Sequence, residues 1–210
     1  MLAVAVALGA AALLPTVASH DHSVAAADAR TNRAAFHDAM RQLWEDHIVW
    51  TRMFIVSAVD DLPDLGVATD RLLRNQDDLG DAIKPFYGDA AGEQLSALLR
   101  EHILGAATLL NAAKAGDSAA VEKAAAAWFA NGDEIAAFLS QANPPNWPLD
   151  EMQAMMRDHL DLTLAEAVAR LEGRYADDAA AYDQVHVQIL HMADMLSDGI
   201  VAQFPASFAR

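Results

Sequence analysis

The chain has 210 residues, of which 54% are hydrophobic and 21% charged, a composition typical of one globular domain with its own core. Its 30 acidic and 14 basic side chains give a formal net charge of -16, which argues against nucleic acid or an anionic membrane surface as a partner. Cysteine is absent, which excludes disulfides, thiolate nucleophiles and thiolate metal sites and leaves mainly nitrogen and oxygen ligands.

Residues 1–27 have the outline of a signal peptide followed by a flexible N-terminus. The run from Met1 to Leu14 is almost entirely apolar, and Thr16 and Ala18 are small residues that suit cleavage. The run is shorter than the roughly 20 apolar residues of a transmembrane helix. We therefore expect removal of the leader and a periplasmic or secreted protein with no stable membrane insertion. A buried N-terminal helix of the mature domain is the alternative.

Residues 28–210 predict a single all-α domain of six helices. Apolar residues recur at helical spacing along this region, and no alternating pattern typical of strands competes with it. Proline and glycine clusters interrupt the pattern at residues 62–66, 85–89, 115–118 and 143–148 and near Gly173. Short connections favour antiparallel neighbours, so the expected architecture is a six-helix bundle made of three αα-hairpins.

An internal repeat supports this division into hairpins. His47, His102 and His159 each follow an acidic residue and precede Ile or Leu, and they are separated by 55 and 57 residues. Asn75 and Asn131, in the helices that follow the first two, are 56 residues apart. A unit repeated three times fits these spacings, and an open superhelical stack of the three units is the alternative to a closed bundle.

Several polar residues are predicted to face the core of this bundle. At about 100° per residue, the three repeated histidines fall near the centre of the apolar face of their helices. In the last helix, His186 lies nearer than His191 to the position that the 56-residue spacing predicts. His191 points away from that helix's apolar face and is expected at the surface. The candidate metal ligands are His47, His102, His159, Glu166 and His186.

This ligand set leads to metal binding as the functional hypothesis. Imidazole and carboxylate ligands suit a transition-metal ion, namely zinc, copper, iron or manganese. Burying several histidines and a carboxylate is costly unless each finds a partner, and one cation satisfies them together. Asn75, Asn131, Thr51 and Thr163 are expected to orient the imidazoles. Methionines at helical spacing, Met156 and Met192 among them, are either thioether ligands for copper or gap-filling core residues.

Two other functions compete with a metal-binding protein. In a helical interaction or scaffold module, each histidine is structural, and Glu166 pairs with Arg170 in a buried ion pair. In a metal-dependent oxidase, the ion keeps an open coordination position for a substrate. The sequence contains no Gly-rich phosphate loop, nucleophile elbow or His-Glu-x-x-His motif, and no organic cofactor is indicated. Whether the protein is an enzyme stays open at this point.

Overall fold

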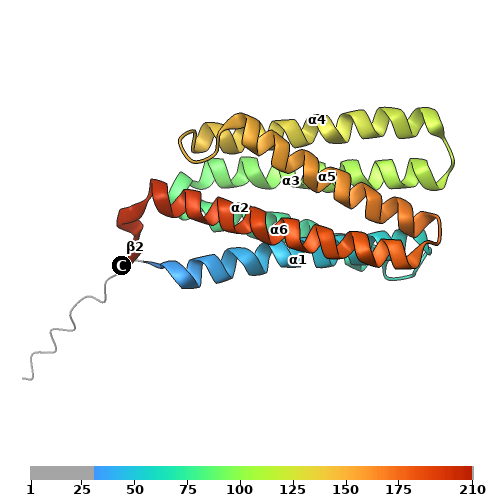
Figure 1. The fold of residues 1–210 in the computed structure, drawn as a ribbon, viewed down its shortest axis with the longest axis horizontal. Coiled ribbons are helices and arrows are strands. Elements are labelled where there is room, and N and C mark those ends of the chain that lie inside the picture. The colour runs from blue at the N-terminus through green and yellow to red at the C-terminus, as the bar shows by residue number, and fades with distance from the viewer. Residues whose placement is uncertain (1–30, 210) are drawn as a thin grey trace, which may run out of the picture.

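The computed structural model describes residues 31–209, and the expected signal peptide at residues 1–27 lies outside the described residues. The described part of the chain is an all-α six-helix bundle, as the sequence predicts (Figure 1). Its helices are α1 (Arg33–Val59), α2 (Leu65–Tyr87), α3 (Asp89–Lys114), α4 (Ser118–Ala142), α5 (Leu149–Leu171) and α6 (Tyr175–Gln203).

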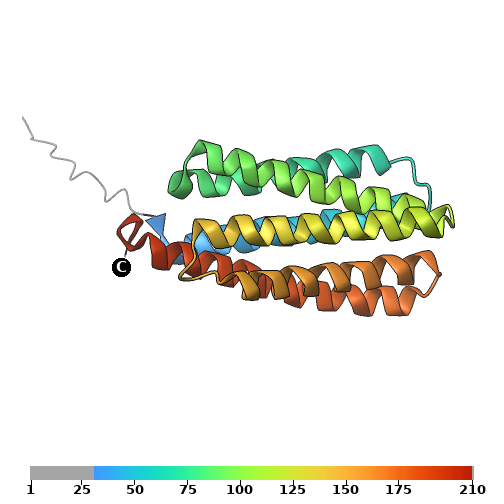
Figure 2. The same cartoon turned by 90° about the horizontal axis from the view of Figure 1, so that it is seen from above.

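The six helices close into a ring around one core. Each helix packs against the next one along the chain, and α6 also packs against α1. The chain reverses direction at each short connection, and the helices lie side by side in both views (Figures 1 and 2). Contacts of α1 with α3 and with α5 cross the interior of the ring. The bundle is therefore closed, and the open stack that the repeat left as an alternative is excluded.

The connections between helices follow local sequence signals. Gly88 joins α2 to α3 as a single residue with a φ of 85°, a backbone conformation that glycine adopts without a steric penalty. The side chain of Asp117 caps α4 by accepting a hydrogen bond from the Ala120 backbone N–H at 3.0 Å. Helix α2 continues through Pro85 to Tyr87, because a proline in the last turn removes only one helical hydrogen-bond donor.

The two ends of the described chain are held together at one end of the bundle. The short strands β1 (Thr31–Asn32) and β2 (Phe208–Ala209) pair in parallel, and β2 follows the 3-10 helix η1 (Pro205–Ser207). The ring of Phe208 packs on Phe36 and Phe86, with centroid separations of 5.2 and 5.4 Å. This aromatic cluster fastens the C-terminal segment to α1 and α2.

The interior is apolar apart from a few buried polar side chains. Its larger cluster of buried hydrophobic residues includes Trp128, Ile135 and Ile189, and a smaller cluster includes Phe54 and Leu72. Across residues 31–209, no helix combines the length and the apolar character that crossing a bilayer requires. Burying a polar group in such a core is costly unless it has a partner, so the few buried polar groups are the candidates for a functional site.

Candidate metal centre

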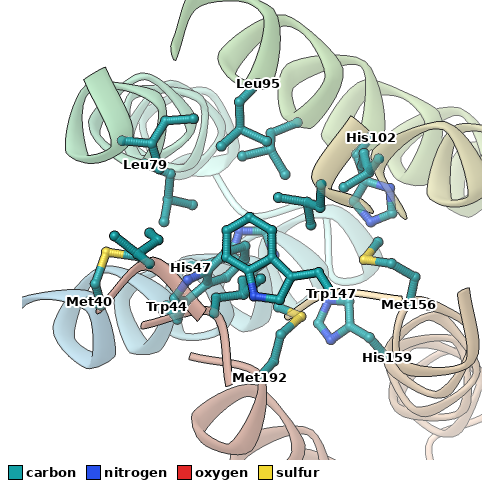
Figure 3. Close-up of a pocket in the computed structure, with 16 residues that line it drawn as sticks. Met40, Trp44, His47, Leu79, Leu95, His102, Trp147, Met156, His159 and Met192 are labelled. Carbon is teal, nitrogen blue, oxygen red and sulfur yellow. The ribbon is translucent and has the colours of Figure 1, made fainter. Parts of the chain in front are cut away.

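Three of the predicted histidines meet at the centre of the bundle. His47 on α1, His102 on α3 and His159 on α5 are 3%, 4% and 4% exposed. The ring of His159 lies between the other two, with centroid separations of 5.9 Å to His47 and 6.5 Å to His102. All three line one internal cavity of about 30 Å³, large enough for a water molecule or an ion (Figure 3).

A carboxamide from the same hairpin orients two of these imidazoles. His102 Nδ1 lies 3.0 Å from Asn131 Oδ1, and the amide of Asn131 donates to the Leu98 carbonyl, one turn before the histidine. His159 Nδ1 lies 3.1 Å from Gln188 Oε1, and that amide donates to the Met155 carbonyl in the same way. Because each amide oxygen is an acceptor, each Nδ1 carries the proton. The lone pair of each imidazole is therefore on Nε2, the atom with no partner in the described part of the chain.

The first hairpin departs from this pattern. The amide of Asn75 donates to the Leu43 carbonyl at 2.9 Å, again one turn before the histidine. The oxygen of Asn75, however, accepts from Gln76 Nε2 at 3.1 Å instead of from the imidazole. His47 Nδ1 and Gln76 Oε1 are both buried and have no hydrogen-bond partner within residues 31–209. His47 is thus the least constrained of the three rings.

The threonines act differently from the sequence-based expectation. Thr51 and Thr163 do not contact an imidazole nitrogen; each hydroxyl donates to the backbone carbonyl of the histidine one turn earlier, at 2.7 and 2.8 Å. A threonine in a helix commonly satisfies its hydroxyl in this way. The expectation that these two residues orient the rings is therefore wrong, whereas Asn131 does orient one.

Burial keeps the three imidazoles neutral. Removal from water lowers the pKa of His47 to about 3, and the neighbouring His159 and His102 rings lower it further by disfavouring a second positive charge nearby. The pKa of His102 falls to about 3 for the same two reasons, although its bond to Asn131 opposes the shift. Burial also lowers the pKa of His159, against the effect of Gln188. At neutral pH the site is a set of uncharged nitrogen donors.

Thioethers and the indole rings of Trp44 and Trp147 are part of the wall of the cavity, and Trp128 lies behind His102. Met40, Met156 and Met192 line the cavity together with the three histidines (Figure 3). Trp128 stacks on His102 with a centroid separation of 5.1 Å, and its indole N–H donates to the His102 carbonyl at 3.1 Å. The described wall contains no carboxylate.

A surface cleft lies on the other side of Met192. It has a volume of about 330 Å³, and Met155, Met195, Asp158 and His191 line it with Met192. His191 is exposed, as the sequence predicts, while Met192 is only 3% exposed. One methionine thus contributes to both the surface cleft and the central cavity.

The two other predicted ligands lie elsewhere. His186 is half-buried at the surface, where its Nε2 lies 3.0 Å from Glu45 Oε1. Glu166 is buried, as expected, but Arg52 Nη1 lies 2.7 Å from its Oε1 and 2.8 Å from Asp178 Oδ1. Burial raises the pKa of Glu166 to about 7, and Arg52 opposes that shift. Neither His186 nor Glu166 lines the central cavity.

Arg170 does not pair with Glu166, contrary to the alternative interpretation of the sequence. Its guanidinium contacts Asp60 and lies 3.6 Å from Asp178. Arg52 of α1 takes the place of Arg170 as the partner of Glu166, because α1 packs against both α5 and α6.

Sequence reasoning missed Gln188, although a signal for it was present. Gln188 follows His159 by 29 residues, and Asn131 follows His102 by the same interval.

Within residues 31–209, no three His, Asp or Glu side chains already lie close enough together to hold a metal ion. Three rings bound to one tetrahedral ion through Nε2 would have centroids about 5 Å apart. Metal binding therefore requires the rings to move inward from their present separations.

Comparisons of this chain with models of known protein families, with curated proteins and with solved structures found no match. The function has to be inferred from the site itself.

Proposed function

We propose that this protein binds one transition-metal ion at the centre of its helical bundle, through Nε2 of His47, His102 and His159. The observation that carries the proposal is the arrangement of His102 and His159, which line one cavity and whose Nδ1 atoms face carboxamide oxygens, so that Nε2 of each ring is free to bind an ion. In metal sites, a hydrogen bond at one ring nitrogen commonly orients a histidine whose other nitrogen binds the ion.

A bound cation accounts for lone pairs that a purely structural role leaves unsatisfied. The amide of Asn131 or Gln188 satisfies only one nitrogen of each ring. A proton is a poor partner for the other nitrogen, since burial lowers the pKa of all three histidines. A metal ion brings its charge to several donors at once and is held by the sum of their bonds.

The donor set favours copper(I) among the transition metals. The site offers neutral imidazoles, the described wall holds no carboxylate, and the cost of burying an ion rises with the square of its charge. A monovalent ion is therefore less costly here than zinc(II). Met40, Met156 and Met192 add thioether sulfurs to the wall, and soft sulfur ligands select copper(I).

The methionine-lined cleft offers a route from the surface to the site. Met192 lines both spaces, with Met155, Met195 and His191 on the outer side. Copper(I) passing from one thioether to another would stay coordinated while it loses its water. In this arrangement, the ion enters between α5 and α6.

Titration of the untagged, metal-free protein tests this function. Copper(I) is added anaerobically in competition with a chromophoric copper(I) chelator, and zinc(II) is titrated separately. We expect one copper(I) per chain and binding weaker by at least about 100-fold in His102→Gln. The matched control is His186→Gln, which replaces a predicted ligand that lies outside the cavity and should leave the affinity unchanged.

Two results would contradict the proposal. The first is the lack of a stoichiometric ion, together with an unchanged melting temperature in the presence of copper(I) or zinc(II). The second is equal affinity in His102→Gln and the wild type, provided that circular dichroism shows the variant to be folded. Tighter binding of zinc(II) than of copper(I) would retain the metal site and overturn the preference for a monovalent ion.

A further inference from the structure

A second, larger cavity lies one turn further along the same helices. It has a volume of about 220 Å³ and is lined by side chains of α1, α3, α4 and α5. Thr51 and Thr163, which are part of its wall, follow His47 and His159 by one helical turn. Trp128 separates the two spaces, because it stacks on His102 and also lines this second pocket.

The wall of this pocket is almost entirely hydrocarbon. Its main apolar surfaces come from Phe54, Leu109, Leu110 and Leu171, and its described lining includes no charged side chain. The hydroxyls of both threonines are already donated to helix carbonyls. The indole N–H of Trp128 is likewise bonded to the His102 carbonyl. The pocket therefore offers a ligand no free N–H or O–H donor from its side chains.

The position of α5 explains why the space exists and how it opens. Helix α5 begins beside α4 and ends beside α6, so it diverges from α4 toward its C-terminus (Figure 1). The pocket occupies this divergence, between Val121 near the start of α4 and the turn of α5 that carries Leu164, Ala167 and Val168. These four residues are half-buried, so they form the edge of the pocket that faces solvent.

We infer that this pocket binds a small uncharged hydrocarbon-like molecule, such as one with a single aromatic ring or a short aliphatic chain. An apolar cavity of about 150 Å³ stays dry and accepts benzene, and this one is larger. Ionic ligands are excluded, since the wall offers no charge or free donor to replace their hydration. Apolar ligands need neither, and they restore the van der Waals contacts that an unfilled space lacks. The inference is independent of the proposed metal site.

Calorimetric titration with toluene tests the inference on the metal-free protein. We expect saturable binding with a dissociation constant on the order of 0.1–1 mM, and no binding of benzoate, which has the same ring with a charge. The variant Ala167→Phe places a phenyl ring in the pocket and should weaken toluene binding at least 10-fold. The matched control is Ala165→Phe, the same substitution at an exposed position of α5, which should bind toluene like the wild type.

Saturable toluene binding that is lost only in Ala167→Phe supports the pocket as the binding site. Absence of saturable binding to the wild type overturns the inference, and so does equal binding by both phenylalanine variants. If Ala167→Phe does not fold, as judged by circular dichroism, Ala106→Leu on α3 fills the same pocket from the opposite side and replaces it in the comparison.

Discussion

Acid should destabilise this protein through its buried histidines, and His102 allows the effect to be measured. Burial lowers the pKa of His102 to about 3, whereas a histidine in the unfolded chain has its ordinary value of 6.5. Between these two values the unfolded chain binds a proton that the folded protein does not. The stabilising contribution of the neutral imidazole is thus fully present above pH 6.5 and is lost as the pH falls.

The magnitude follows from proton linkage. Lowering the pH from about 7 to about 5 should decrease the free energy of unfolding by about 2 kcal/mol for a single histidine with this shift. His47, whose pKa is also about 3, adds a similar amount. Glu166 acts in the opposite direction, because its raised pKa of about 7 makes the folded protein take up a proton first. The net pH dependence therefore mixes the two signs, and only a comparison of variants isolates His102.

Urea denaturation of metal-free protein at the two pH values provides the comparison. His102→Gln replaces the imidazole with a neutral amide, so its free energy of unfolding should fall by about 2 kcal/mol less than that of the wild type. His191→Gln removes an exposed histidine and should reproduce the wild-type fall. If His102→Gln and the wild type lose the same stability between the two pH values, the conclusion that His102 is buried and neutral is refuted.

Three further substitutions test other parts of the structure. Asn131→Leu removes the acceptor that orients His102 and should weaken copper(I) binding by about 10- to 100-fold in the chelator competition. The circular dichroism spectrum of this variant should overlay that of the wild type. Arg52→Met leaves the buried Glu166 without its cation and leaves Asp178 with Arg170 alone, and it should cost about 3–5 kcal/mol in urea denaturation. A loss below about 1 kcal/mol would contradict the buried ion pairs. Gly199→Ala places a methyl group 2.1 Å from Trp147 Nε1 and should lower the free energy of unfolding by about 1–3 kcal/mol, whereas unchanged stability would show that the connection between α4 and α5 does not lie so close to α6.

The helices and their ends could be predicted from the sequence because they depend on residues that are close together in the chain. Apolar residues at helical spacing mark each helix, and clusters such as residues 115–118 and 143–148 mark the ends. The sequence favoured a closed bundle but left an open stack as the alternative, because closure depends on the packing of α6 against α1, which lie at opposite ends of the described chain. The divergence of α5 from α4, which opens the second pocket, also depends on packing between distant helices.

The site was predictable where it depends on one helix and not where it depends on two. His47, His102 and His159 are central on their own apolar faces, so their burial followed from periodicity alone. His186 was chosen because it lies close to a position fixed by the 56-residue spacing, but the residue that fills the equivalent role is Gln188, 57 residues after Asn131. A difference of two residues rotates a side chain by about 200° around a helix, enough to move it from core to surface.

Similar contacts in two pairs of neighbouring helices, α3 with α4 and α5 with α6, explain why polar atoms collect at the centre of an apolar bundle. In the second and third hairpins, a carboxamide from the even-numbered helix holds the histidine Nδ1 of its own odd-numbered partner. The bond within each of these hairpins uses Nδ1 and leaves Nε2 unused. When the hairpins close into a ring, His102 and His159 line one cavity together with His47, and none of the hairpins forms this cavity alone. A repeat that served only to satisfy a buried histidine would be complete within each hairpin, and it would not need to bring three of these rings to one cavity.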